Sequence, residues 1–126
     1  MDSVARALPA LIRAEKLQGK AAKAGFDWKE VTPALDKVSE ELSELRQAVE
    51  DNSNVEEELG DLLFAVVKVG RFAGLDSECA LQAACEKFIR RFRRVEVLAG
   101  GPMDQMETER LEELWRQAKR EECEQI

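Results

Sequence analysis

Two pairs of carboxylates occur with the same spacing in this sequence. Glu41 and Glu44 form the first pair, and Glu58 and Asp61 form the second. On a helix, residues three apart are separated by roughly 60° around the axis, so each pair lies on one face. Each pair also has the same offset from the apolar stripe of its own segment. If these stripes pack together in an antiparallel hairpin, both pairs point into one space between the helices.

Carboxylates that converge in this way favour a divalent cation. Without cations they would repel each other, which would raise one or more of their pKa values or reduce stability. Oxygen ligands, in a chain without histidine, suit Mg²⁺ or Mn²⁺. Mg²⁺ usually keeps several waters and binds substrate phosphates, so the pattern predicts a phosphate-handling enzyme. A glycine inside a helix costs about 1 kcal/mol relative to alanine, so its presence at position 60 needs a reason. Close approach of a ligand or of another helix would be such a reason.

A solvated acidic face remains the alternative for either pair, because acidic residues on exposed helices are common. A polyphosphate substrate also requires cations from the protein. Lys87 and Arg91 lie one helical turn apart, and Lys119 follows Trp115 by one turn. Lysine and arginine on one face can hold a triphosphate, although a solvated basic face fits the same residues. Trp115 suits either stacking on a base or anchoring a core.

The segments that carry these residues are predicted to be helical. Five helices are expected, at about residues 9–23, 33–49, 55–73, 77–99 and 109–118. Signals for helix starts are Pro9, Thr32-Pro33, Asn54, Asp76-Ser77 and Thr108, and signals for helix ends are Gly25, Gly74 and Gly100. An aromatic connection at residues 26–28 joins the first two expected helices. Its rings, like that of Trp115, suit either stacking on a base or anchoring a core. The expected fold is an all-α, four-helix-bundle-like single domain over residues 1–126, with an extra C-terminal helix.

Composition excludes several other classes of protein. A chain of 126 residues with 44% hydrophobic and 36% charged residues fits one domain of amphipathic helices. The net charge of −7 disfavours a nucleic-acid polymer as partner. No apolar run is long enough for a transmembrane helix, and the first residues lack the apolar core of a signal peptide. The three cysteines form no CxxC motif, so a reduced, cytoplasmic protein is expected.

At the acidic pairs the chain resembles the MazG family of the all-α NTP pyrophosphatase superfamily. The family's motif EExxE, followed by ExxD, stands here as Glu40-Glu41-Leu42-Ser43-Glu44 and Glu58-Leu59-Gly60-Asp61. Further blocks are GFDW at 25–28, GDLLFAVV at 60–67, ALQAACEKFIRRF at 80–92 and LEELWRQAKR at 111–120. EExxE alone is a weak signal, but all the blocks in this order are specific. The resemblance is greatest to the C-terminal domain of two-domain MazG proteins.

The resemblance implies a dimeric, Mg²⁺-dependent enzyme, with Mn²⁺ as a plausible substitute, that cleaves nucleoside triphosphates to monophosphates and pyrophosphate. The implied metal ligands are Glu41, Glu44, Glu58 and Asp61. The implied catalytic residues are Glu40, Glu41, Glu58 and Asp61. The implied substrate-binding residues are Lys87, Arg91, Trp115 and Lys119. Some relatives carry a lysine where this chain has Asn54.

Three alternatives stay open at the level of the sequence. The first is a selective relative that acts on dUTP or dCTP, and the second is a phosphoribosyl-ATP pyrophosphohydrolase. The third is a catalytically idle helical module for dimerisation or regulation. The family further suggests removal of aberrant nucleotides or control of nucleotide pools.

Overall fold

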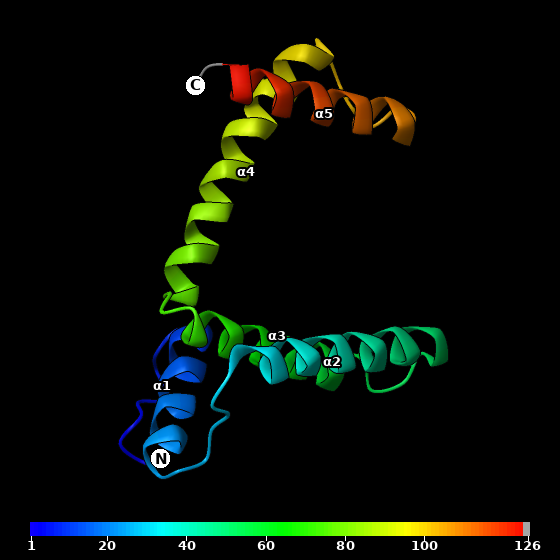
Figure 1. Ribbon diagram of the computed structural model, residues 1–126. Coiled ribbons are helices and arrows are strands. Elements are labelled where there is room, and N and C mark those ends of the chain that lie inside the picture. The colour runs from blue at the N-terminus through cyan, green and yellow to red at the C-terminus, as the bar shows by residue number, and fades with distance from the viewer. Residues whose placement is uncertain (125–126) are drawn as a thin grey trace. The chain divides into compact units, whose positions relative to one another are not determined.

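The computed structural model describes residues 1–124 and shows an all-α protein, as predicted (Figure 1). The helices are α1 (Ala10–Lys23), α2 (Val31–Asp51), α3 (Val55–Phe72), α4 (Ser77–Ala99) and α5 (Thr108–Glu124). No strand occurs within these described residues. None of the helices is both long enough and apolar enough to cross a bilayer. The chain forms two compact units, one of residues 1–80 and one from Leu81 onward.

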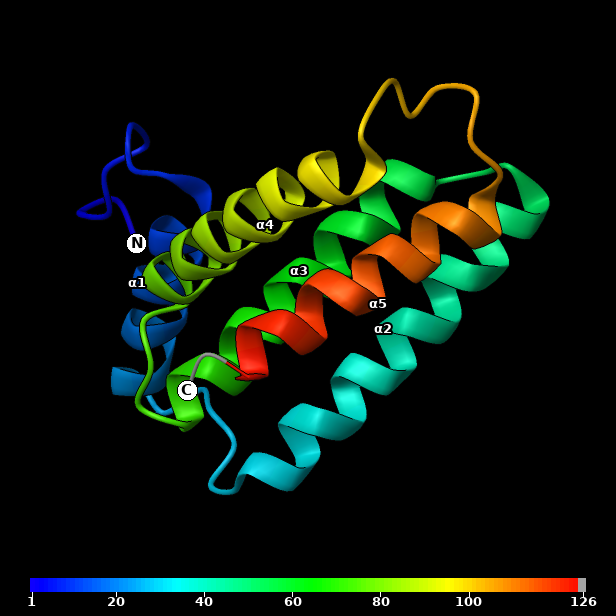
Figure 2. The same cartoon turned by 90° about the horizontal axis from the view of Figure 1, so that it is seen from above.

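In the first unit, α2 and α3 form the predicted antiparallel hairpin and run side by side (Figure 2). The turn between them is short because Asn52 and Asn54 both adopt left-handed backbone conformations, with φ of 52° and 60°. Asparagine tolerates this region better than most residues do. The turn therefore reverses the chain within three residues and brings the two acidic segments next to each other.

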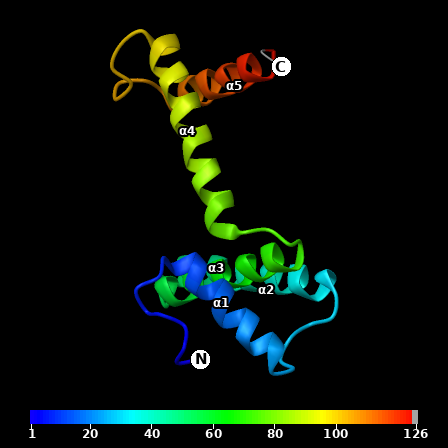
Figure 3. The same ribbon diagram turned by 90° about the vertical axis from the view of Figure 1, so that its left-hand side faces the viewer.

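Small residues fill the interface between α2 and α3. Ala34 and Ala48 are buried on α2, and Ala65 and Val67 are buried on α3. Helix α1 packs across α3 (Figure 3). Gln18 of α1 is buried there, and its Nε2 donates to the backbone carbonyl oxygen of Phe64 at 2.9 Å. Small side chains let the helix backbones approach closely, which holds side chains at the interface in defined positions.

The buried row on α2 differs from the stripe expected from the sequence. Ala34, Glu41 and Ala48 are seven residues apart and form the buried row. The larger side chains of Leu42 and Val49, next to that row, stay 46% and 59% exposed. The sequence pattern predicts burial of the larger apolar residues. In the structure α2 packs closely against α3, and the row that contains alanine is the one buried at that interface. Glu41 therefore occupies a core position.

Glycine ends two helices as predicted. Gly25 and Gly74 have φ values of 96° and 74°, which a residue with a side chain adopts only with strain. The backbone N–H of Phe26 donates to Ala21 at 2.9 Å, and that of Leu75 donates to Gly70 at 2.9 Å. These bonds satisfy carbonyl groups that the last helical turn would otherwise leave unpaired. The caps fix the directions in which the chain leaves α1 and α3.

Several predicted helix boundaries were wrong. Pro9 caps α1 and is not its first residue, and boundaries of α2 and α5 also differ. Helix α2 begins at Val31 with Glu30 in the capping position, so Thr32 and Pro33 lie inside its first turn. Pro33 is tolerated there because first-turn N–H groups have no partner within the helix. Thr108 is the first residue of α5 and does not cap it. The same helix continues to Glu124 and does not stop at Ala118, since no glycine or proline follows that alanine.

The second unit has its own small core between α4 and α5. Val95, Leu114 and Ala118 are buried, and Leu98, Ala99, Met103, Met106 and Trp115 pack around them. Ion pairs connect the same two helices, Arg91 with Glu122 and Arg94 with Glu121. The hydrogen bond from Arg94 lowers the pKa of Glu121. Apolar packing and these ion pairs hold α5 against α4.

Candidate metal centre

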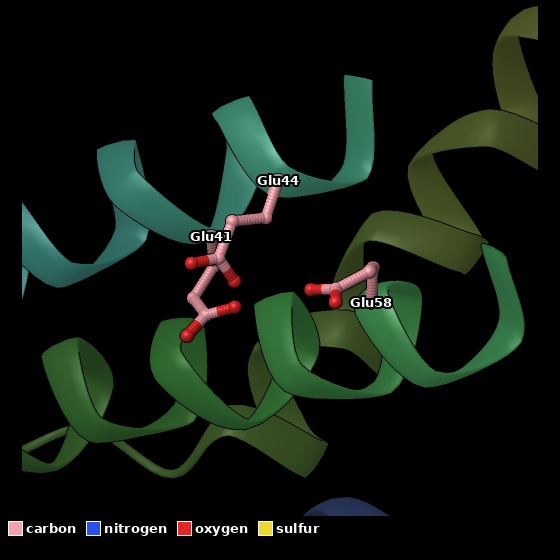
Figure 4. A group of neighbouring side chains, drawn as sticks. All are labelled: Glu41, Glu44 and Glu58. Carbon is pink, nitrogen blue, oxygen red and sulfur yellow. The ribbon is translucent and has the colours of Figure 1, made fainter. Parts of the chain in front are cut away.

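Three carboxylates converge between α2 and α3. Glu41 and Glu44 come from α2, Glu58 comes from α3, and these three residues are called the acidic cluster below (Figure 4). Each supplies a carboxylate oxygen, and these oxygens all lie within 4.8 Å of one another. The i, i+3 spacing places the α2 pair on one face, and the antiparallel hairpin brings Glu58 opposite it. The structure thus brings together three of the four predicted metal ligands.

Burial makes this cluster different from a solvated acidic face. The Glu41 side chain is only 7% exposed. One carboxylate oxygen of Glu41, Oε2, is buried without a hydrogen-bond partner among the described residues, and the same is true of Oε2 of Glu58. A buried polar atom without a partner is costly and requires a physical explanation. Two such oxygens beside a third carboxylate fit a site for a hard cation.

The pKa of Glu44 is raised from 4.5 to about 7. The largest cause is a hydrogen bond with Glu41, which favours the protonated form of Glu44, and charge repulsion from Glu41 follows. Partial burial and the neighbouring Glu58 raise the pKa further. The predicted effect of converging carboxylates is therefore present in this pair. A divalent cation would remove this repulsion by taking the place of the shared proton.

Lys37 is a component of the site that the sequence analysis missed. Its ammonium Nζ lies 3.0 Å from Oε1 of Glu41 and 3.5 Å from Oε1 of Glu40. The hydrogen bond to Glu41 raises the pKa of Lys37. The signal was present in the sequence, because Lys37 precedes Glu41 by four residues on the same helix face. Glu40 itself is 58% exposed and contacts Lys37 on the outer side of the cluster.

Asp61, the fourth predicted ligand, is not part of the group that converges. It lies one turn after Glu58 on α3 and is exposed. Its shorter side chain reaches less far than that of glutamate. Gly60 beside it has no atom within 4 Å of where a Cβ would stand, apart from its chain neighbours and its own helix backbone. Close approach by another helix of the described chain is therefore not the reason for Gly60.

A cavity of about 240 Å³ adjoins the acidic cluster at the turn between α2 and α3. It is lined by Glu44, Gln47, Ala48, Asp51, Ser53, Asn54 and Glu58. All of its charged lining groups are carboxylates. An anionic substrate would enter such a cavity only together with cations, which is the chemistry expected of a metal–polyphosphate complex.

The predicted substrate-binding residues all lie in the second unit. Arg91 donates from Nε to Oε2 of Glu122 at 2.5 Å, and its guanidinium carbon lies 5.8 Å from the centre of the Trp115 ring. The Trp115 ring also packs on Phe88, with centroids 5.4 Å apart. Lys87 is exposed on α4, one turn before Arg91. Arg91 and Trp115 are thus close together, and Arg91 already has a carboxylate partner that the sequence did not indicate.

Lys119 lies on the exposed face of α5, beside a cavity of about 480 Å³. The same cavity is lined by Arg116, Arg120, Cys123 and Glu124. Three cationic side chains and one carboxylate therefore surround it. This arrangement is compatible with an anionic ligand, and it is equally compatible with the solvated basic face considered above.

Comparison with known proteins gives a consistent result. A family model described as the MazG nucleotide pyrophosphohydrolase domain matches residues 24–96. This range contains the acidic cluster, Asp61, Lys87 and Arg91, whereas Trp115 and Lys119 lie beyond it. The match covers more than half of the chain and includes both helices that carry the carboxylates.

Two relatives extend this similarity over most of the chain. The first is the nucleoside triphosphate pyrophosphohydrolase of Escherichia coli (strain K12), which is 49% identical over 129 residues, with 97% of this chain and 49% of that protein covered. The second is the nucleoside triphosphate pyrophosphohydrolase/pyrophosphatase MazG of Thermotoga maritima. It is 42% identical over 115 residues, with 89% of this chain and 45% of that protein covered. The chain spans about half the length of these relatives.

Proposed function

Because this chain belongs to the MazG nucleotide pyrophosphohydrolase family, we propose that it hydrolyses nucleoside triphosphates to monophosphates and pyrophosphate with Mg²⁺ held at the acidic cluster. One observation carries this proposal: carboxylates from two helices converge within 4.8 Å, and two of their buried oxygens have no hydrogen-bond partner in the described part of the chain. The relatives bear names for the same reaction. Mn²⁺ has the same preference for oxygen ligands and is the expected substitute.

Glu41, Glu44 and Glu58 are the proposed metal ligands, and Asp61 is proposed as the fourth. Bound Mg²⁺ would supply positive charge to the phosphate oxygens and lower the pKa of a coordinated water. The chain's own carboxylates orient the attacking water and accept its proton, with Glu40 and Glu41 as the candidates.

The attacking water forms a bond to the α-phosphorus. The bond from that phosphorus to the bridging oxygen breaks, and pyrophosphate leaves with the bonding electron pair. We further propose that Lys87 and Arg91 neutralise the pyrophosphate and that Trp115 and Lys119 lie near the nucleotide. For Arg91 this requires exchange of its present partner, Glu122, for a phosphate.

A homodimer is the proposed assembly. Leu35, Leu42 and Val49 lie seven residues apart on α2, and each is between 46% and 59% exposed. On α3, Leu59, Leu63 and Val66 are likewise nearly half exposed. Covering such rows stabilises a protein by roughly 25 cal/mol per Å² of apolar surface. A second copy of the chain would supply that cover. The three free cysteines, all exposed, fit a reducing cytoplasmic environment, and this location is also a proposal.

Hydrolysis of a panel of canonical and damaged NTPs and dNTPs tests the proposal. With Mg²⁺, the expected products are the monophosphate and pyrophosphate in equal amounts, and chelation of the metal stops the reaction. Glu58→Ala is expected to abolish activity with helical content retained, whereas Glu57→Ala, at the exposed neighbouring position, is the matched control. Hydrolysis to the diphosphate and phosphate, or full activity of Glu58→Ala, would contradict the proposal.

A further inference from the structure

Arg91, the proposed partner of the pyrophosphate, is already paired with a carboxylate of its own unit. Nε of Arg91 donates to Oε2 of Glu122 at 2.5 Å. The two side chains are only 15% and 32% exposed, so water screens this pair less than it screens a pair on the open surface. Carboxylates and phosphates accept hydrogen bonds from the same N–H groups of an arginine. Glu122 therefore occupies a donor of Arg91 that a phosphate oxygen would otherwise use.

Glu122 lies on the same face of α5 as two of the residues proposed to lie near the nucleotide. It follows Trp115 by seven residues and Lys119 by three. On a helix, these offsets place all three side chains within roughly 60° of one another around the axis. Glu121, by contrast, is turned from Glu122 by about 100°. The helix thus places the carboxylate of Glu122 among side chains proposed to bind an anionic substrate.

The Trp115 ring supports Arg91 whichever anion the arginine binds. The guanidinium carbon of Arg91 lies 5.8 Å from the centre of that ring, the distance of a cation–π contact. The ring packs in turn on Phe88 and against the core between α4 and α5. Arg91 can therefore exchange Glu122 for a phosphate while its guanidinium stays against the same ring.

The second ion pair between α4 and α5 has a different geometry. Arg94 donates to Glu121 from both Nε and Nη2, and the bond from Nη2 reaches the other carboxylate oxygen at 3.2 Å. Two parallel bonds between an arginine and a carboxylate make one of the stronger kinds of ion pair. Arg94 is also not among the residues proposed to bind the substrate. The pair of Arg94 with Glu121 therefore serves as a structural link between the two helices, and it provides a control for the pair of Arg91 with Glu122.

We propose that Glu122 competes with the substrate for Arg91 and so sets the affinity for its pyrophosphate part, an inference that rests on the proposed function. A triphosphate, or the pyrophosphate product, binds Arg91 only by displacing Glu122. A nucleoside monophosphate lacks the part that Arg91 binds, so its affinity is independent of Glu122. As pyrophosphate leaves, Glu122 forms its bond with Arg91 again, which favours release of that product.

Calorimetric titration of Glu122→Gln with inorganic tripolyphosphate and Mg²⁺ tests this inference. The substitution keeps the length of the side chain and removes the competing charge. Binding is expected to be roughly 2- to 5-fold tighter than in the wild type, the factor that corresponds to a partly exposed ion pair. Glu121→Gln is the matched control, because it removes the same charge one residue away together with the ion pair to Arg94, and it should bind as the wild type does. A purely structural ion pair predicts the opposite sign, so unchanged or weaker binding by Glu122→Gln would overturn the inference.

The gain in affinity must also depend on Arg91. In protein that carries Arg91→Gln, adding Glu122→Gln should leave the affinity for tripolyphosphate unchanged, because the two residues act as one pair. The same gain with and without Arg91 would show that Glu122 acts by general charge repulsion, and the inference would be wrong. In kinetic assays of Glu122→Gln, KM for triphosphates should fall by the factor found in the titration, while inhibition by nucleoside monophosphates stays the same. An equal gain for monophosphates would also contradict competition at Arg91.

The two proposals fail in different ways. If triphosphates are hydrolysed and Glu122→Gln leaves both KM and the affinity for tripolyphosphate unchanged, the competition inference is wrong and the proposed function stands. If the wild-type chain hydrolyses no triphosphate while Glu122→Gln still binds tripolyphosphate more tightly through Arg91, the proposed function is wrong and Glu122 still competes with a polyphosphate for that arginine.

Discussion

Replacing Glu41 by glutamine is expected to stabilise the metal-free protein and to remove its response to Mg²⁺. The substitution keeps the shape of the side chain and removes the charge from the buried row of α2. Oε2 of Glu41 is buried without a hydrogen-bond partner among residues 1–124, a situation that costs about 1–3 kcal/mol. The amide of Glu41→Gln can donate to Glu44 or Glu58, which replaces repulsion by a hydrogen bond.

Loss of the ion pair with Lys37 offsets part of this gain. Lys37 is 38% exposed, so water screens its pairing with Glu41 and the loss of that pair is small. The net stabilisation is therefore about 1 kcal/mol, which corresponds to a rise in Tm of about 3–5 °C for a chain of this size. The wild type gains about 2.7 kcal/mol when Mg²⁺ exceeds its Kd by 100-fold, and it should then melt about 10 °C higher. Glu41→Gln should show almost none of this increase.

Thermal unfolding followed by circular dichroism, with and without Mg²⁺, measures both effects. Glu50→Gln is the matched control, because Glu50 is an exposed residue of the same helix. It should leave the Tm of the metal-free protein and the Mg²⁺ response unchanged. If Glu41→Gln melts at a higher temperature in Mg²⁺ by as much as the wild type does, Glu41 is not a ligand. If its metal-free Tm falls by several degrees, the buried carboxylate is stabilising and the reasoning is refuted.

Three further predictions concern pH, the reaction and the assembly. The pKa of Glu44 is raised from 4.5 to about 7, so its contribution to stability is complete below pH 4.5 and is lost as the pH rises through 7. The Tm of the metal-free protein should therefore fall between pH 5 and 8. Glu44→Gln should remove that fall. Hydrolysis in ¹⁸O-labelled water should place the label in the monophosphate; label in pyrophosphate would contradict attack at the α-phosphorus. Leu42→Glu should convert a dimer to a monomer in light scattering with helicity retained, and an unchanged mass would show that the exposed α2 row is not the interface.

The local features of the fold could be predicted because they depend on short-range rules. Gly25 and Gly74 mark helix ends, since both have backbone conformations that favour glycine. The start of α2 was harder to place, because a proline is acceptable anywhere in a first helical turn. The five helices and their order therefore follow from the sequence, while some of their boundaries depend on details that short-range rules leave open.

The chemistry of the acidic cluster could be predicted in part. Spacing, together with the offset of each pair from its apolar stripe, predicted that Glu41, Glu44 and Glu58 would converge if the two helices formed a hairpin, and the structure brings these three together. Spacing did not indicate that Glu41 would be buried, since burial depends on which row of α2 faces α3. Asp61 has the same spacing as the others and remains exposed, so its role as a ligand is still a prediction.

Contacts between distant parts of the chain could not be predicted. The partner of Arg91, Glu122, lies on another helix, and the pairing of Asp27 with Arg71 also joins separate segments. Each such pair is one of many combinations of opposite charges in a chain with 19 basic and 26 acidic residues. Their identity follows from the packing of helices, which fixes the few combinations within reach.

The most direct test of the metal centre is a crystal structure of the protein soaked with Mn²⁺, analysed by anomalous scattering. The predicted result is a strong anomalous peak between α2 and α3, coordinated by Glu41, Glu44 and Glu58, with the Asp61 side chain turned toward it. A protein that is active with Mn²⁺ in solution but shows no peak at these carboxylates, or a peak elsewhere, would contradict the account.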